Sequence, residues 1–178
     1  MGSGIKLTWY EIAYDGNSEE TTKSKVEKQL KTQSAKDALN DDRAVYVIRS
    51  NPPFAFSYPL QPSPVIYIGK GKFWNRLSQS HSKRIEILHK RIGLTFSIQF
   101  CSPRRKKTEL AYANVEADLI HMYINKFGTL PLMNSRKEWP NKEYSYTKWS
   151  SRPALIEVDE RYFCSLQPFD GLFDLEGA

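Results

Sequence analysis

Two tyrosines and one arginine stand at spacings that suit chemistry on a phosphate. Tyr46 and Tyr67 each lie in the middle of a short apolar run, and period-two alternation places Tyr67 on the same side as Gly69. If the two runs pair as strands, both phenols can project from one face. Gly69 and Gly71 leave little bulk beside Tyr67, so a phosphate or another backbone could approach closely. Arg76 follows nine residues after Tyr67, and its planar guanidinium suits a phosphate oxygen.

Each of these residues also has a purely structural interpretation. A tyrosine inside a strand usually serves packing, and a helix arginine usually points into solvent. The same choice arises at Glu116, which lies about 60° from the centre of the apolar stripe of an expected helix at 108–127. A carboxylate there is costly unless it is paired or bound to a cation. Glu116 is therefore either a metal ligand or the partner of a basic residue, and one carboxylate with waters and phosphate suits Mg²⁺.

The net charge of +6 is unevenly spread along the chain. Residues 70–107 hold eleven lysines and arginines against a single acid, Glu86, and the rest of the chain is net negative. Such a field attracts a polyanion, for which nucleic acid is the usual candidate, although a solvated basic surface is the alternative. The candidate nucleic-acid contacts in this region are Lys72, Arg84, Arg104, Arg105 and Lys106.

Composition excludes several classes of protein. No apolar run approaches the roughly 18 residues that a membrane helix needs. Cys101 and Cys164 cannot form a disulfide framework and have no metal-ligand spacing. We therefore expect a cytoplasmic protein without a membrane partner.

The pattern predicts an α+β fold, with a small, mostly antiparallel three-stranded sheet flanked by helices and with extensions at both termini. The expected strands are 43–50, 64–69 and 94–100, and the expected helices are 73–92 and 108–127, the latter with an apolar stripe through Ala113, Ala117, Ile120, Ile124 and Phe127. The first two strands should form a hairpin around a proline-rich loop, 51–64, that is not itself a strand. Residues 15–42 predict a weak surface helix or arm, and 154–158 is one more candidate strand.

Taken together, these residues resemble the GIY-YIG nuclease superfamily. The two half-motifs are Ala44-Val45-Tyr46, with Ala for the usual Gly, and an intact Tyr67-Ile68-Gly69. The family's arginine, histidine, glutamate and asparagine match Arg76, His81, Glu116 and Asn134. The resemblance covers about residues 43–135, although the gap between the half-motifs is longer than in typical members. It divides the chain into a tag remnant and N-terminal arm (1–42), a nuclease core (43–135) and a C-terminal extension for DNA or dimer contact (136–178).

The resemblance implies phosphodiester hydrolysis with one divalent cation, Mg²⁺ or another such as Mn²⁺, on Glu116. Tyr46 would act as general base or orient the attacking water, and Tyr67 would hold the water or the scissile phosphate. Arg76 would neutralise charge on a non-bridging oxygen. His81 and a lysine near the tyrosines, Lys70 or Lys72, would assist, and Asn134 would contact nucleic acid.

The sequence therefore predicts a metal-dependent endonuclease of double-stranded DNA. A site-specific restriction enzyme fits the short chain, and cutting both strands would call for a homodimer at least on DNA. The alternatives are a non-catalytic nucleic-acid-binding module, or a repair, mobile-element or RNA-directed nuclease of the same superfamily. Residues 134–153 interleave cations with aromatics such as Trp139, which could stack on bases or simply cap the sheet.

Overall fold

Four strands form one sheet in the order β1-β5-β2-β4, and every neighbouring pair is antiparallel. The computed structural model describes residues 5–15, 23–76, 82–103, 111–139 and 144–168. Its strands are β1 (Tyr10–Tyr14), β2 (Val45–Ser50), β3 (Phe54–Phe56), β4 (Val65–Lys70), β5 (Phe96–Cys101) and β6 (Cys164–Leu166). Its helices are α1 (Lys23–Gln29), α2 (Gln33–Asn40), α3 (Phe73–Arg76), α4 (Ser82–Ile92), α5 (Ala111–Phe127), α6 (Lys148–Ser151) and a 3₁₀ helix, Arg152–Leu155.

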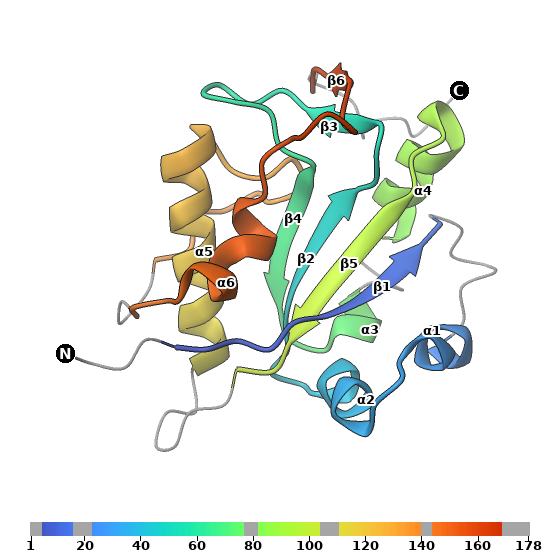
Figure 1. Ribbon diagram of the computed structural model, residues 1–178, viewed down its shortest axis with the longest axis vertical. Helices are drawn as coiled ribbons and strands as arrows, with labels where there is room; N and C mark the ends of the chain where they lie inside the picture. Colours follow the sequence, from blue (N-terminus) through green and yellow to red (C-terminus); the bar gives the residue numbers. More distant parts are fainter. Residues whose placement is uncertain (1–4, 16–22, 77–81, 104–110, 140–143, 169–178) are drawn as a thin grey trace.

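The α+β class and the mostly antiparallel sheet agree with the sequence, but the sheet has a fourth strand that the sequence analysis did not predict. β1 comes from the N-terminal arm and pairs with β5, so that Ile12 lies opposite Ile98. Figure 1 shows β1 at one edge of the sheet and α5 beside β4 at the other. β1 is only five residues long, and such a short alternating pattern is a weak signal until its partner strand is known.

The face of the sheet that carries Tyr46 is filled with aromatic rings. Tyr46 lies opposite Phe100 on β5, and both side chains are fully buried. α3 begins at Phe73, whose ring packs edge-on against Tyr46 at 5.2 Å and stacks on Phe100 at 5.8 Å between centroids. This packing fixes the start of α3, and therefore the backbone of Arg76 at its end, relative to the tyrosine.

α5 is buried on more sides than a surface helix. Its fully buried residues include Val115, Leu119 and Tyr123, whereas Ala113 and Ile124 of the predicted stripe are only partly buried. The predicted stripe is confirmed at Ala117, Ile120 and Phe127, but the buried surface is wider than the stripe and is displaced from Ala113 and Ile124. A helix that is covered on two sides carries apolar residues over a wide arc. Hydrophobic periodicity then no longer identifies a single buried face, and the prediction rests on that periodicity.

The second cover of α5 comes from the C-terminal extension. Asp118 is buried and accepts hydrogen bonds from the Tyr146 hydroxyl at 2.5 Å and from the Tyr144 backbone at 3.3 Å. Lys126 donates to the Leu155 carbonyl at 2.8 Å. Tyr144 and Tyr146 therefore pack onto the core. Of the two roles considered for the aromatics of 134–153, base stacking or packing, these two side chains serve packing.

Two local predictions near the prolines are wrong. Residues 51–64 include a short strand, β3, which pairs in parallel with β6 from the far end of the chain. Residues 154–158 do not form a strand, because the chain turns into the 3₁₀ helix with Pro153 in its first turn. Both errors arise where a distant partner or a single proline decides the local conformation.

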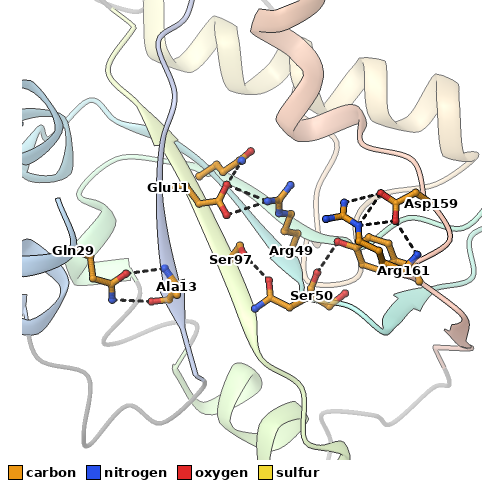
Figure 2. Close-up of polar contacts among 11 residues, drawn as sticks. Glu11, Ala13, Gln29, Arg49, Ser50, Ser97, Asp159 and Arg161 are labelled. Carbon is orange, nitrogen blue, oxygen red and sulfur yellow. Dashed lines mark hydrogen bonds and ion pairs between the residues drawn. The ribbon is translucent and has the colours of Figure 1, made fainter. Parts of the chain in front are cut away.

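A polar network ties β1 to the rest of the sheet (Figure 2). Arg49 donates from one nitrogen to both carboxylate oxygens of Glu11 at 3.1 Å, reaching across β5, and Gln99 donates to the same carboxylate at 2.5 Å. The Gln29 side chain hydrogen-bonds both the amide and the carbonyl of Ala13, at 2.9 and 3.1 Å.

Among the described residues, no helix is long and apolar enough to cross a membrane.

The packing of β1 predicts a loss of stability when its central side chain is shortened. Ile12 is 1% exposed, and Ile12→Ala should lower the free energy of unfolding by about 2–5 kcal/mol. The matched control is Ile92→Ala, because Ile92 is 38% exposed at the end of α4 and should cost less than about 1 kcal/mol. Urea denaturation measures both. Equal losses in the two variants would contradict the docking of β1 on the core.

Candidate functional site

The two tyrosines predicted to share a face do share one. In the β2–β4 hairpin Tyr46 lies opposite Gly69, and Ile48 lies opposite Tyr67. Residues directly opposite each other in an antiparallel pair project from the same face. The two phenol rings accordingly meet with centroids 5.8 Å apart.

The sequence predicts open space beside Tyr67 at Gly69, where a phosphate or another backbone could approach. In the structure the Tyr67 ring itself occupies this space, and Gly69 thereby allows the contact between Tyr67 and Tyr46. The ring of Tyr67 itself lies over Gly69, so that a Cβ there would stand 2.3 Å from Cε1 and 2.8 Å from the hydroxyl oxygen of Tyr67. Any larger residue at position 69 would push the ring away. The glycine therefore provides space for the neighbouring tyrosine to fold along the strand toward Tyr46.

Burial sets the protonation of both phenols. Tyr46 is fully buried, and this burial, with Tyr67 next to it, raises the pKa of Tyr46 far above its ordinary value of about 10. Burial also raises the pKa of Tyr67, and the negative charge of Glu116 adds to the effect. Arg76 lowers both pKa values without reversing either shift. Both phenols are therefore neutral near pH 7, and neither is a ready base.

Glu116 of α5 meets Lys70 at the end of β4. The Lys70 ammonium donates to Oε2 of Glu116 at 2.6 Å and to Oε2 of Glu138 at 3.4 Å. Burial raises the pKa of Glu116, and the bond from Lys70 partly offsets this shift. Burial alone would lower the pKa of Lys70, but the contact with Glu116 outweighs it and the pKa is raised. The ion pair is thus favourable, and the salt-bridge interpretation of Glu116 is realised in the structure.

A cavity of about 310 Å³ opens at this edge of the sheet. Its polar lining comes from β4, α4, α5 and the segment after α5: Tyr67, Arg84, Glu116, Asn134, Ser135, Arg136 and Glu138. Lys70 starts from the opposite face of β4 to Tyr67, because the two are three residues apart on one strand. Lys70 does not line the cavity itself, but it contacts two residues that do, Glu116 and Glu138.

Asn134 closes the free edge of β4. Its side-chain oxygen accepts from the Ile68 amide at 3.0 Å, its side-chain nitrogen donates to the Ile68 carbonyl at 2.8 Å, and the Met133 amide donates to the Ile66 carbonyl. The amide of Asn134 is engaged on both sides by Ile68. Asn134 therefore holds the edge of β4 and also lines the cavity, while its expected contact with nucleic acid stays a prediction.

The remaining predicted residues fall into three groups. Arg84 lines the cavity, and exposed Arg76 lies within electrostatic reach of Tyr46 and Glu116. Lys72 lies outside the cavity lining and forms an exposed ion pair with Asp42 at 3.2 Å. The other candidates fall outside the described residues: His81, Arg104, Arg105 and Lys106.

Two further charged residues line the cavity: Arg136, one of the cations expected at 134–153, and Glu138, which sequence reasoning missed. Both are exposed and stand two and four positions after Asn134. Their closeness in sequence to Asn134 could have indicated their position. Because Asn134 binds the edge of β4, the residues that follow it lie near the same edge.

The donor set suits a cation that keeps most of its hydration shell. Within the described parts of the chain, no three His, Cys, Asp or Glu side chains gather into a group that could hold a metal ion. Glu116 offers one buried carboxylate at a cavity that also has room for phosphate and water, and Lys70 contacts just one of its oxygens. Mg²⁺ is commonly bound through one or two carboxylates together with waters and substrate phosphates, so these residues fit it.

Comparison with known proteins adds no assignment, since no family model, no curated protein and no solved structure matches this chain.

The position of the Tyr67 ring predicts a strong coupling between positions 67 and 69. Gly69→Ala should cost about 1–3 kcal/mol of folding stability, because the new methyl group overlaps the Tyr67 ring. In a Tyr67→Ala background the same change should cost much less, which gives a coupling energy of about 0.5–3 kcal/mol in a double-mutant cycle. Chemical denaturation of the four proteins measures it. Additive effects would show that the ring does not lie over Gly69.

The ion pair predicts a pH-dependent loss when Lys70 is removed. Lys70→Met leaves the Glu116 carboxylate buried without its cation and should cost about 1–3 kcal/mol near pH 7. The loss should shrink as the pH falls through the raised pKa of Glu116, because a protonated carboxyl needs no cation. Lys72→Met is the matched control, since its exposed pair should contribute at most about 0.5 kcal/mol at any pH. A pH-independent loss in Lys70→Met would contradict this account.

Proposed function

We propose that the chain is a metal-dependent endonuclease of double-stranded DNA, with a GIY-YIG-like core. The observation that carries the proposal is the cavity that joins the Tyr67 phenol, the Glu116 carboxylate and the arginines Arg84 and Arg136. A phosphodiester needs these partners: cations for its oxygens, a hydrogen-bond donor and an anchor for a metal ion. The excess of basic residues at 70–107 would draw the polyanion toward this side.

Each side chain then has a defined task. Arg84 and Arg136 bind the non-bridging oxygens of the phosphate, with their planar guanidinium groups providing two donors each. Tyr67, neutral at pH 7, would donate its hydroxyl hydrogen to a phosphate oxygen, or accept a hydrogen bond from the attacking water and so orient it, with the proton of the water passing to solvent. Glu116 would hold a divalent cation, which would provide Lewis-acid stabilisation of the leaving oxygen when bound. Lys70 must release Oε2 of Glu116 for the carboxylate to serve as a ligand, and it is then free to contact the phosphate.

Tyr46 acts through Tyr67 in this arrangement. Its hydroxyl is buried and its ring packs between Tyr67 and Phe73. It therefore positions the Tyr67 phenol over Gly69, and it would reach water itself only when the Tyr67 ring moves aside. Of the two roles that the resemblance implies for Tyr46, orientation of the attacking group fits a neutral buried phenol better than proton abstraction.

The proposal predicts that cleavage depends on the Glu116 carboxylate. Supercoiled plasmid with Mg²⁺ should be nicked or linearised by the wild-type protein, and Glu116→Gln should lower the rate at least about 10²-fold. DNA affinity in EDTA should stay equal or rise, because a negative charge is removed. Glu157→Gln is the matched control, as Glu157 also pairs with a lysine, Lys126 at 2.7 Å, but belongs to an exposed surface pair outside the cavity.

Sequencing of the plasmid ends settles the finer assignment. A site-specific restriction enzyme gives one recurrent sequence at the ends, and a paired cut in both strands indicates a homodimer on DNA. Scattered ends indicate a nuclease without sequence preference. Cleavage by Glu116→Gln at the wild-type rate would remove Glu116 from the mechanism.

A non-catalytic nucleic-acid-binding module is the second candidate. The observation that favours it is the closed state of the site, in which Lys70 neutralises Glu116 and Tyr46 is fully buried. A protein of this kind would bind plasmid DNA yet leave it intact with Mg²⁺ and with Mn²⁺. The same assay therefore separates the two functions.

A further inference from the structure

A second cavity, of about 200 Å³, is also lined by α5 and by the segment that follows it. It is lined by three residues of α5 and three of the following segment: His121, Ile124, Asn125, Lys137, Glu138 and Trp139. Glu138 lines both cavities. The second cavity therefore adjoins the proposed phosphate site at Glu138.

Trp139 gives this cavity a flat apolar wall. Its side chain is 71% exposed although tryptophan is the largest aromatic residue, and its ring is held edge-on against His121 with centroids 5.6 Å apart at 82°. The edge-on contact leaves a face of the indole for a second aromatic ring. An exposed aromatic surface of this size, placed in a concavity, indicates a binding site.

The rest of the lining includes both apolar and polar groups. Ile124 adds an apolar contact, whereas Asn125, Lys137 and Glu138 offer an amide, an ammonium and a carboxylate. A purely apolar ligand would displace water from these three polar groups without forming new hydrogen bonds to them, which is unfavourable. A planar ring with donors and acceptors along its edge satisfies both kinds of group, and the bases of nucleic acids have this form.

We propose that this cavity holds a nucleobase of the bound DNA, unstacked from its neighbours and stacked on Trp139. The inference rests on the proposed function, because the shared Glu138 puts the base next to the phosphate that occupies the first cavity. It deepens that function by naming Trp139 as a substrate-binding residue and Asn125, Lys137 and Glu138 as the groups that face the base edge. Glu138 also contacts Lys70 at 3.4 Å, so the two cavities share an electrostatic partner.

Binding measured without cleavage tests the inference. In EDTA, a short fluorescein-labelled duplex of mixed sequence is compared with the same duplex carrying one bulged adenine, by fluorescence anisotropy. The wild-type protein should bind the bulged duplex several-fold more tightly. The bulged adenine is already unpaired, so less free energy is needed to move it into the cavity. Trp139→Ala should lose this preference and bind the bulged duplex about five- to a hundredfold more weakly, whereas Trp139→Phe should keep most of it.

A matched control and the salt dependence separate stacking from a general loss. Phe163 is 78% exposed and lies outside both cavities, so Phe163→Ala should bind both duplexes as the wild type does. The dependence of affinity on salt should be unchanged in Trp139→Ala, since no phosphate contact is removed.

The outcomes distinguish this inference from the proposed function. If the wild-type protein cleaves plasmid DNA and Trp139→Ala keeps wild-type affinity for both duplexes, the base site is wrong and the nuclease proposal stands. The base site is equally overturned if the wild-type protein binds the two duplexes with the same affinity. If the wild-type protein binds neither duplex, the proposed function fails and the inference fails with it.

Discussion

The bond between the Lys70 ammonium and the Glu116 carboxylate links β4 to α5 at the open edge of the sheet. A carboxylate as buried as that of Glu116 requires a cation, and Lys70 meets the requirement at 2.6 Å. Neighbouring contacts hold β4 and α5 in position around this ion pair. Asn134 hydrogen-bonds the edge of β4, and the C-terminal extension packs on α5 through Tyr146 and Asp118. The same arrangement leaves Glu116 at a cavity, where a divalent cation and a phosphate could replace the ammonium.

The parts of this site that the sequence predicts are those set by local periodicity. Alternation placed Tyr46 and Tyr67 on one face of a hairpin, and the β2–β4 register bears this out. Helical periodicity singled out Glu116 as an acid that needs a partner, although it left the choice between a metal ion and a lysine open. In both cases the information lies within a few residues of the side chain concerned, so no knowledge of distant contacts was needed.

The parts that the sequence did not reveal depend on contacts between distant segments or on the path of one side chain. β1 and the β3–β6 pair form because segments from both ends of the chain meet the core. The ring of Tyr67 lies over Gly69 because of its own rotamer, which no periodicity describes. Tyr46 is buried between Tyr67 and Phe73, and of the two roles left open by the sequence this burial favours orientation over proton abstraction.

The central claim is that Glu116 exchanges Lys70 for a divalent cation at the cavity where Tyr67 meets the phosphate. A crystal structure of the protein with Mn²⁺ and a short duplex made uncleavable by phosphorothioate linkages tests it most directly. We expect an anomalous peak at coordination distance from the Glu116 carboxylate, with Lys70 withdrawn from Oε2 and a phosphate beside Tyr67. A structure in which Lys70 still binds Glu116 while Mn²⁺ and the phosphate lie elsewhere would contradict the account.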